Sequence, residues 1–491
     1  MMIEAVERPQ YKLLTVSNRG PAEHRWSDDG GIETVPGQGG LATALRVAAT
    51  LHPTIWLSSP LTDVDRLVAE GKANLGSRDG ASHFVVTDPE EYDLFYGRFS
   101  NEVLWFLQHA LAWPDDLDRA EREHAWQDGY LKVNAAFAEK VIDEIDDGCI
   151  RAVMFHDYHF YTAPALVRAA RPDAFLQHFI HIPWPAASEW KRLEASIVRE
   201  ICRGMLGNDS VVFQTHESAT NFLDTCAHFL PECSIDVAAG EVSLDGRTTR
   251  AWADAISVDP EELDEQGRTP EFSRYRYLLR PSPGVKTLLR VDRLDLTKNV
   301  VRGFEAYRLL LRQHPELREK VYFLALLVPS RGDIESYREY QDEALGMVDA
   351  INREFGSLHW KPIRVIFENN RLQALAAMSL YDVLLVNPVA DGMNLVAKEG
   401  PIVNTRDGVL VLSRTAGAYE ELGETAVGVD PYDVAATAEA LYRALTMPGP
   451  ERHDRWRWLD SIIRGHDLRS WFRALLDDID ANVPAPASTA A

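Results

Sequence analysis

Residues 385–399 read Leu-Val-Asn-Pro-Val-Ala-Asp-Gly-Met-Asn-Leu-Val-Ala-Lys-Glu, and this stretch decides the fold prediction. It begins as the end of an apolar strand, turns at Asp391-Gly392 and continues in a pattern that predicts a helix. Glycine permits a tight turn and a close ligand approach, and a helix start points its free N–H groups at an anion. Glu399 would lie about two helical turns beyond Asp391. This layout suits a nucleotide sugar, with phosphates at the amides and hydroxyls at the carboxylates, although an ordinary strand-to-helix connection fits it too.

Strand-like and helix-like segments alternate on both sides of this stretch. Each short apolar run is followed by polar residues and a helical pattern, as in strands that are buried on both faces of a parallel sheet. The predicted strands are 12–17, 152–155, 176–180 and 211–214 in the first half, and 287–291, 321–328, 364–367, 383–387 and 409–412 in the second. Two such sets predict an α/β protein with two doubly wound sheets and a cleft between them. Ligands in such sheets bind beyond the carboxyl ends of the strands.

The size and composition limit the function classes. A chain of 491 residues favours two or more domains. Its net charge of −24 opposes non-specific binding to nucleic acid or to an anionic membrane, because both need a basic surface. No apolar run approaches the roughly 20 residues needed to cross a bilayer, and the N-terminus lacks the apolar core of a signal peptide. The four cysteines, Cys149, Cys202, Cys226 and Cys233, match no zinc pattern. Buried thiols in a cytoplasmic protein are therefore expected.

Cationic residues follow several of the predicted strands. Arg19 follows the first strand, and a guanidinium is a bidentate partner for phosphate. Arg293 and Lys298 follow the strand that opens the second half, where two cations would neutralise a leaving diphosphate. Arg331 follows the strand 321–328. The alternative for each residue is an ordinary surface charge or a surface salt bridge.

Histidines and a glycine-rich loop mark further strand ends. The run His156-Asp157-Tyr158-His159 could bind sugar hydroxyls or move a proton. No second ligand cluster accompanies it, so no metal site is predicted. His181 stands in His-Ile-Pro-Trp-Pro, where proline fixes the backbone, and its alternative role is to cap a core strand. The loop Gly37-Gln-Gly39-Gly40-Leu41 lets the backbone pack against a ligand, but alone it reads as a flexible loop.

Together these motifs resemble those of the trehalose-6-phosphate synthases. The matching segments are Ser17-Asn18-Arg19, Gly39-Gly40-Leu41-Ala42, Tyr96…Ser100-Asn101…Trp105, 156–159, His181-Ile-Pro-Trp-Pro, Arg293-Leu-Asp-x-x-Lys298, Ser330-Arg331-Gly-Asp333 and 391–399. They extend from about residue 13 to residue 399, and their number and order make the resemblance specific. Without it, Tyr96 and Trp105 would indicate only core aromatics.

The resemblance implies a GT-B fold with two Rossmann-like lobes and a retaining, metal-independent glucosyl transfer. The donor would be UDP-glucose or GDP-glucose, the acceptor glucose 6-phosphate and the product trehalose 6-phosphate, and no cofactor is implied. The implied domains are an acceptor-binding lobe at 1–245, a connecting region at 246–285 and a nucleotide-sugar-binding lobe at 286–465. The segment 466–491 is expected to form a helix that packs back on the N-terminal lobe, followed by a disordered tail. Partners other than the two substrates are not implied, and the oligomeric state is left open, a homo-oligomer included.

Roles are implied position by position. The residues implied for the acceptor are Arg19, Tyr96, Trp105 and Arg331 at the phosphate and Asp157 at the sugar. Those implied for the donor are Gly39, Gly40, His181, Arg293, Lys298, Asp391, Gly392, Met393, Asn394, Leu395, Val396 and Glu399. Within this set Arg293, Lys298 and backbone N–H groups would hold the diphosphate, and Glu399 would contact the ribose. The implied catalytic residues are Asp157, His181, Arg293 and Lys298.

The chain departs from the family pattern in two places. After Trp56 it reads Leu-Ser-Ser-Pro-Leu-Thr, where many of these synthases carry a Gly-Trp-Pro/Ser-Gly-like segment near the acceptor. Asn299 follows Lys298, where glycine is common. The segments around Trp190 and Asn299 are also similar to pseudo-glycosyltransferases that join cyclitols, although the intact Arg293 motif favours a glucosyl donor. Alternatives are therefore another acceptor, such as a cyclitol phosphate or glycerol 3-phosphate, or a non-catalytic binding protein.

Overall fold

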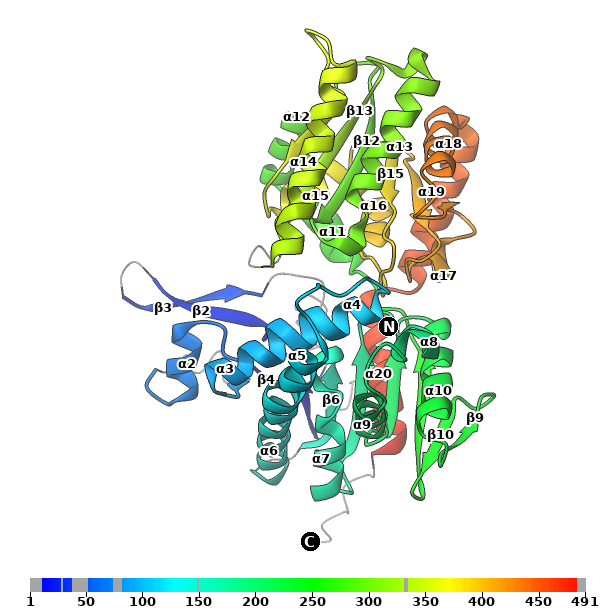
Figure 1. Cartoon of the computed structure of the whole chain (residues 1–491). Coiled ribbons are helices and arrows are strands. Elements are labelled where there is room, and N and C mark those ends of the chain that lie inside the picture. The colour runs from blue at the N-terminus through cyan, green and yellow to red at the C-terminus, as the bar shows by residue number, and fades with distance from the viewer. Residues whose placement is uncertain are drawn as a thin grey trace, which may run out of the picture. The chain divides into compact units, whose positions relative to one another are not determined.

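The chain forms two compact units in the computed structural model, which describes residues 11–27, 30–37, 52–73, 82–147, 150–330 and 334–483 (Figure 1). The first unit comprises Met1–Asp254 and Arg469–Ala491, and the second comprises Ala255–Leu468. The chain thus leaves the first unit, completes the second, and then returns to the first.

The first unit is built on a nine-stranded sheet with the order β5-β4-β1-β6-β7-β8-β11-β10-β9. The strands are β1 (Lys12–Val16), β4 (Thr54–Ser58), β5 (Ser82–Phe84), β6 (Ile150–His156), β7 (Phe175–Ile180), β8 (Ser210–Phe213), β9 (Ser234–Asp236), β10 (Glu241–Leu244) and β11 (Arg247–Ala253). The strands from β5 to β11 in this order pair in parallel, and only β10 and β9 are antiparallel additions. Every residue of β7 and β8 is buried, as expected for parallel strands that are covered on both faces. A separate hairpin joins β2 (Ala22–Trp26) to β3 (Ile32–Pro36).

Helices cover this first sheet, and one of them comes from the end of the chain. The described helices are α2 (Asp63–Ala69), α3 (Pro89–Tyr92), η1 (Asp93–Leu104), α4 (Trp105–Gln108), α5 (Arg119–His124), η2 (Ala125–Tyr130), α6 (Leu131–Asp147), η3 (Tyr158–Phe160), α7 (Ala163–Ala170), α8 (Ala187–Trp190), α9 (Ala195–Met205), α10 (His216–Phe229) and α20 (Leu468–Asn482). In α20 the fully buried Trp471 ring meets the Phe179 ring edge-on, with centroids 5.1 Å apart. Gln177 Nε2 donates to Asp478 Oδ2 over 2.8 Å, so β7 holds α20 by polar as well as apolar contacts.

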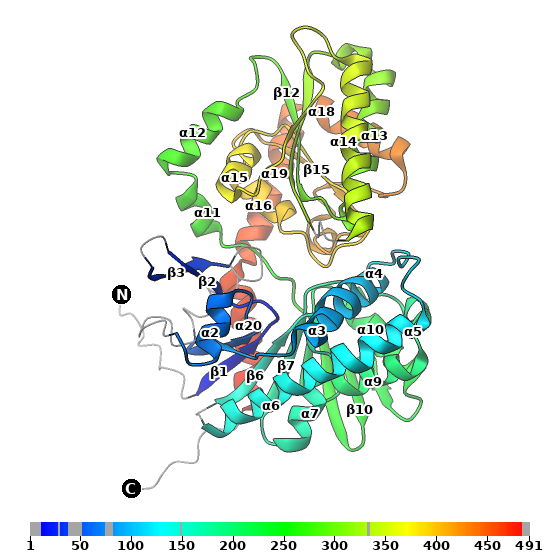
Figure 2. The same ribbon diagram turned by 60° about the vertical axis from the view of Figure 1, so that its left-hand side comes forward.

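The second unit is a six-stranded parallel sheet with the order β14-β13-β12-β15-β16-β17. Its strands are β12 (Lys286–Arg293), β13 (Val321–Val328), β14 (Ile363–Ile366), β15 (Val383–Val386), β16 (Val409–Ser413) and β17 (Val427–Val429). Its helices are α11 (Pro260–Gln266), α12 (Pro270–Leu279), η4 (Leu296–Lys298), α13 (Val300–Gln313), η5 (Pro315–Leu317), α14 (Glu335–Phe355), α15 (Arg371–Met378), α16 (Val396–Val403), α17 (Tyr419–Leu422), α18 (Val434–Thr446) and α19 (Gly449–Gly465). Figure 2 shows α13 and α14 on one face of this sheet and α12, α15 and α16 on the other. Apolar side chains of α13, α14 and α18 form one core cluster with the strands.

The predicted α/β architecture with two doubly wound sheets is confirmed. Each strand predicted above is present, with ends shifted by two residues at most. The segment 246–285, expected as a connection, contributes β11 to the first sheet and then forms α11 and α12. Cys202 and Cys226 are buried free thiols and Cys233 is a partly buried one, whereas Cys149 lies outside the described residues. Within the described ranges, no helix combines the length and apolar character that a membrane span requires.

Candidate functional site

In each sheet the candidate residues flank the two neighbouring strands at which the strand order reverses direction. In the first sheet these strands are β1 and β6, and in the second they are β12 and β15. Loops leave such a pair on opposite faces of the sheet, which opens a crevice at the carboxyl ends where ligands bind. Arg19 and Asp157 follow β1 and β6, while Lys298 and Asp391 follow β12 and β15. The same topological position is therefore used once in each unit.

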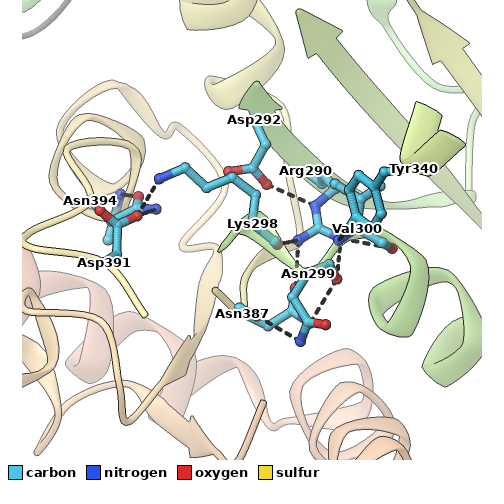
Figure 3. A network of polar contacts seen from close by, with 10 residues as sticks. Arg290, Asp292, Lys298, Asn299, Val300, Tyr340, Asn387, Asp391 and Asn394 are labelled. Carbon is cyan, nitrogen blue, oxygen red and sulfur yellow. Dashed lines mark hydrogen bonds and ion pairs between the residues drawn. The ribbon is translucent and has the colours of Figure 1, made fainter. Parts of the chain in front are cut away.

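In the second unit Lys298 and Asp391 form an ion pair (Figure 3). Lys298 ends the short helical turn η4, which the Asp295 carboxylate caps by accepting from the Thr297 N–H over 3.1 Å. Asp391 also accepts from Asn394 Nδ2 over 3.0 Å. The structure thus brings a cation from one strand end and a carboxylate from the next together, as the switch-point geometry requires.

The turn after Asp391 prepares the start of α16. Asn394 has φ of 81°, a left-handed conformation that asparagine tolerates better than most residues. Its Oδ1 accepts from the Ala397 N–H over 3.3 Å. The N–H groups of residues 394–396 have no acceptor among the described residues. Gly392 and Met393 are buried and form the turn itself, and the Met393 carbonyl accepts from the Ala418 N–H over 2.8 Å.

Glu399 lies in the first turn of α16 beside an arginine that sequence reasoning missed. Arg371, at the start of α15, places Nη2 3.3 Å from Glu399 Oε1 and Nη1 3.0 Å from Glu262 Oε1. Burial raises the pKa of Glu399, and the Arg371 guanidinium opposes that rise. Arg371 follows β14 by five residues, so its only signal in the sequence was a position near another strand end.

Arg293 is the last residue of β12 and differs from its neighbours in having no counter-charge. Its side chain is exposed and has no ion-pair or hydrogen-bond partner within the described ranges. Lys298 is by contrast already paired with Asp391. The local charge is therefore unbalanced toward the positive at Arg293, which suits an anionic ligand.

In the first unit Arg19 lies on the turn after β1, which a polar network holds in place. Asn18 Nδ2 lies 3.2 Å from the Tyr92 hydroxyl, and Ser59 Oγ donates to Asn18 Oδ1 over 3.0 Å. The side chain of Arg19 is exposed, and its interaction with Tyr96 raises its pKa. Tyr96 lies within η1 and stacks on Tyr92, with ring centroids 5.7 Å apart. The fixed turn and the adjoining phenols thus position one guanidinium.

Trp105 and the remaining predicted residues lie in different environments. Trp105 is only 8% exposed and packs against the His109 ring at a centroid distance of 4.1 Å. Gly39, Gly40 and Arg331 lie outside the described residues. In the part of the chain that the structure describes, no group of three or more histidine, cysteine, aspartate or glutamate side chains is arranged to hold a metal ion.

Asp157 has a strained backbone and an unusual carboxyl group. Its φ of 70° with ψ of −176° is rare for a residue with a side chain, and such strain concentrates at functional sites. The strand-end geometry imposes it: the Asp157 N–H donates to the Phe179 carbonyl over 2.8 Å, and its carbonyl lies 2.8 Å from His178 Nε2. Burial raises the pKa of Asp157 to about 7, although backbone N–H groups, including that of His181, oppose the rise.

Three imidazoles surround this strand end, those of His156 and His178 buried and that of His181 partly buried. His156 Nδ1 lies 3.1 Å from His181 Nε2, so one ring donates and the other accepts when both are neutral. Burial lowers the pKa of His181 to about 3 and that of His178 to about 4. At neutral pH His181 is therefore an uncharged hydrogen-bonding group rather than an acid, which suits contact with a sugar hydroxyl.

The raised pKa of Asp157 predicts a pH-dependent stability difference. Between pH 4 and 7 the folded state keeps a proton that the unfolded state has lost, so this residue destabilises the fold progressively as pH rises. Asp157→Asn should remove that effect, and its free energy of unfolding relative to the original chain should rise with pH up to a plateau near pH 8. The largest expected difference in the free energy of unfolding is about 4 kcal/mol, which corresponds to the shift of the Asp157 pKa from its ordinary value of 3.8 to about 7. Denaturant unfolding at pH 5 and pH 8 tests this; a difference independent of pH would contradict it.

Asn299 explains one departure from the family pattern. It has φ of 58°, so a residue that tolerates the left-handed region is required between η4 and α13. Asparagine adds three hydrogen bonds that glycine lacks: Nδ2 donates to the carbonyls of Asn387 (3.0 Å) and Pro431 (2.7 Å), and Oδ1 accepts from Arg302 Nη1 (3.0 Å). Both Asn299→Gly and Asn299→Ala lose these bonds, but only alanine also meets the steric cost. We expect alanine to lower the free energy of unfolding by roughly 1–2 kcal/mol more than glycine. Equal losses in denaturant unfolding would contradict the steric explanation.

Comparisons with known proteins agree with this geometry. A model described as glycosyltransferase family 20 matches residues 11–481. A bifunctional trehalose-6-phosphate synthase/phosphatase of Thermoproteus tenax is 35% identical over 474 residues, with 94% of this chain and 62% of that protein covered. The chain spans 58% and 61% of the length of two further curated relatives.

Two solved structures share the fold over nearly the whole chain. One is described as trehalose-6-phosphate from E. coli bound with UDP-2-fluoro glucose; it is 28% identical, covers 97% of this chain and 100% of its own, and has a TM-score of 0.81. The other is an α,α-trehalose-phosphate synthase (UDP-forming) from Burkholderia xenovorans in complex with glucose-6-phosphate. It is 30% identical with a TM-score of 0.78, covering 96% of this chain and 100% of its own.

Proposed function

Because the chain belongs to glycosyltransferase family 20, we propose that it transfers glucose from a nucleoside-diphosphate glucose to glucose 6-phosphate. The products are trehalose 6-phosphate and a free nucleoside diphosphate, and the anomeric configuration of the glucose is retained. The solved relatives named above contain a UDP-glucose analogue and glucose 6-phosphate, respectively, which supports both substrate classes. We further propose that the enzyme acts in the cytoplasm without a cofactor or a metal.

The observation that carries the proposal is the set of positive groups at the β12/β15 switch point. Arg293 is a cation without a partner among the described residues, Lys298 is held by Asp391, and the N–H groups of residues 394–396, which lead into α16, have no described acceptor. Helix N-termini attract phosphate through these N–H groups and the helix dipole. A donor diphosphate bound here would be neutralised by Arg293, Lys298 and the helix start together, while Glu399 would contact the ribose.

This arrangement supplies what glucosyl transfer requires. The transition state resembles an oxocarbenium ion, and negative charge develops on the departing phosphate, which Arg293 and Lys298 would stabilise. Attack from the same face lets a leaving phosphate oxygen accept the proton of the acceptor hydroxyl. A pair of carboxylic acids of the glycosidase type is then unnecessary. Asp391 and the neutral His181 would bind hydroxyls of the donor glucose.

The acceptor is assigned to the β1/β6 switch point of the first unit. Arg19 is exposed on a fixed turn beside Tyr96, where it can bind a phosphate, and we assign Trp105 to the same phosphate. For Arg331, which lies outside the described residues, the family resemblance alone supports a role toward the acceptor. The Asp157 carboxyl would bind the acceptor sugar. Its pKa near 7 leaves it partly ionised at neutral pH, so it can serve as hydrogen-bond acceptor in one form and donor in the other.

One observation favours a second candidate, a relative that uses another phosphorylated acceptor. The segment after Trp56 that departs from the family pattern packs directly under the Arg19 turn. Ser59 Oγ donates to Asn18 Oδ1 over 3.0 Å, and a Cβ added at Gly20 would lie 2.9 Å from Ser58 Oγ. Because this segment supports the Arg19 turn, its departure from the family pattern would affect acceptor binding rather than donor binding.

A matrix of donors and acceptors tests both candidates. The purified chain is incubated with UDP-, GDP- or ADP-glucose and with glucose 6-phosphate, glycerol 3-phosphate or a cyclitol phosphate, and nucleoside diphosphate release is measured. Release that depends on glucose 6-phosphate, unaffected by a chelator, supports the proposal, and the product's anomeric configuration is read by NMR. Preference for another acceptor would establish the second candidate. Tight nucleotide binding without release on any acceptor would instead indicate a binding protein.

A further inference from the structure

Arg290 is a buried arginine beside the segments that carry Lys298 and Asp391, and none of the roles assigned above includes it (Figure 3). It lies in the middle of β12 with 0% of its surface exposed. Its five N–H groups have five described acceptors. Nε donates to Asp292 Oδ2 over 2.8 Å, and Nη2 donates to Asn387 Oδ1 over 2.5 Å. The guanidinium is therefore completely satisfied and fixed in orientation.

The other three acceptors are consecutive backbone carbonyls at the corner between η4 and α13. Nη2 donates to the Lys298 carbonyl over 2.8 Å, and Nη1 donates to those of Val300 (3.2 Å) and Asn299 (3.5 Å). The left-handed conformation of Asn299 turns these carbonyls toward one point. Arg290 thereby holds the backbone from which the Lys298 side chain extends.

The same guanidinium ties this corner to the end of β15. Asn387, which it contacts, lies four residues before Asp391, and its carbonyl accepts from Asn299 Nδ2 over 3.0 Å. The Val389 N–H donates to the Thr297 carbonyl over 2.8 Å. The two segments that carry Lys298 and Asp391 are thus joined through Arg290 and also by direct contacts with each other.

A buried ion pair is a poor source of stability, because desolvation of both charges opposes their attraction. Arg290 and the 6% exposed Asp292 are such a pair. Arg290 instead has a clear geometric effect, because its planar guanidinium with five N–H donors fixes the positions of several acceptors at once.

We propose that Arg290 is a positioning residue for the donor site, which sets the distance and orientation between Lys298 and Asp391 through the backbone of both segments. This inference rests on the proposed function, because it assigns Lys298 to the donor diphosphate. Arg290 does not touch the substrate in this role. It preorganises the groups that do, and small displacements of such groups lower rates strongly.

Gly303 provides an independent way to displace the guanidinium. It lies in the first turns of α13, and a Cβ built there would lie 2.3 Å from Arg290 Nη1. The guanidinium has no room to retreat without breaking its contacts with the carbonyls. Gly346 in α14 is a matched control, because nothing lies within 4 Å of its added Cβ and helix interiors favour alanine over glycine.

The experiment compares Gly303→Ala, Gly346→Ala and Arg290→Lys in the full chain, by kcat, by the KM of each substrate, by Tm and by the Kd for UDP and GDP in calorimetry. We expect Gly303→Ala and Arg290→Lys to lower kcat/KM for the donor by roughly 10- to 100-fold and to weaken nucleotide binding, with the acceptor KM unchanged. Lysine keeps the charge but has three donors for five acceptors. Gly346→Ala should leave the kinetics unchanged and keep or raise Tm. Unaltered donor kinetics and nucleotide affinity in both site variants, or full activity in Arg290→Lys, would overturn the proposal.

A double variant separates positioning from simple misfolding. In Arg290→Met the space beside Gly303 is no longer occupied by the guanidinium, so adding Gly303→Ala should cause little further loss. Losses that multiply in the double variant would show that Gly303 acts independently of Arg290 and would overturn the proposal. If the original chain releases no nucleoside diphosphate from any donor, the proposed function fails. The nucleotide Kd of the same variants would then still decide whether Arg290 shapes the nucleotide site.

Discussion

Replacement of Arg293 by alanine is expected to lower kcat by at least about 100-fold, because the variant loses a cation that acts on charge developing in the transition state. Arg293 has no counter-charge among the described residues, so its full field is available to the leaving phosphate. The remaining cation, Lys298, is already shared with Asp391 and cannot replace it. Steady-state kinetics with saturating donor and acceptor give kcat directly. The kcat of Arg293→Lys should fall between that of the original chain and that of Arg293→Ala, because lysine keeps a point charge but loses the planar guanidinium with its paired donors.

Arg274→Ala is the matched control for this variant. Arg274 is an exposed arginine on α12 of the same unit, so its removal changes the net charge equally without touching a strand end. Its kcat should equal that of the original chain. A small loss in Arg293→Ala, comparable to that in Arg274→Ala, would remove Arg293 from the leaving-group role.

Replacement of Arg19 by alanine should act on the acceptor instead. We expect the KM for glucose 6-phosphate to rise by about 10- to 100-fold, which corresponds to the loss of a hydrogen-bonded charge pair. The donor KM should stay constant, because Arg19 is assigned to the acceptor phosphate, whereas the cations assigned to the donor diphosphate, Arg293 and Lys298, belong to the second unit. Non-phosphorylated glucose, used as a weak acceptor, should show no difference between the two proteins, since the lost contact is to the phosphate.

Lys12→Ala controls for the charge lost in the Arg19 variant. Lys12 is an exposed cation at the amino end of β1, the opposite end of the strand that leads to Arg19. It should leave all kinetic parameters unchanged. An acceptor KM that stays constant in Arg19→Ala, or a donor KM that rises, would show that the phosphate is bound elsewhere.

The sheets could be predicted because their parallel strands are buried on both faces. Runs such as Val321–Val328 are then apolar throughout and end in polar residues, which is visible in one sequence. The additions to the first sheet could not be predicted in this way. In Arg247–Ala253 exposed and buried residues mix without a clean alternation, and charged positions hide the strand. The long irregular helix η1 was missed for a related reason, since its apolar side chains do not keep the period of 3.6 residues.

The site could be predicted where residues follow strands, and missed where they pair through tertiary structure. Lys298 and Asp391 each stand after an apolar run, so the rule that ligands bind beyond the carboxyl ends of strands selects both residues from the sequence. Arg290 stands inside such a run, where a charged side chain contradicts a buried strand. The signal that could have found it was that contradiction, combined with Gly303 on the helix that follows. Arg371 pairs with Glu262 and Glu399, which come from distant parts of the chain. No local sequence pattern predicts ion pairs between residues so far apart.

The first unit is assembled from two stretches of chain that are separated by the whole of the second. During synthesis the ribosome must therefore release residues 255–468 before Trp471 can reach Phe179. Until then the face of β7 that receives α20 stays open to water, and a chaperone or a neighbouring nascent chain can reach it. The helix α20, the last that the structure describes, thus acts as the closing step of folding for the sheet translated first.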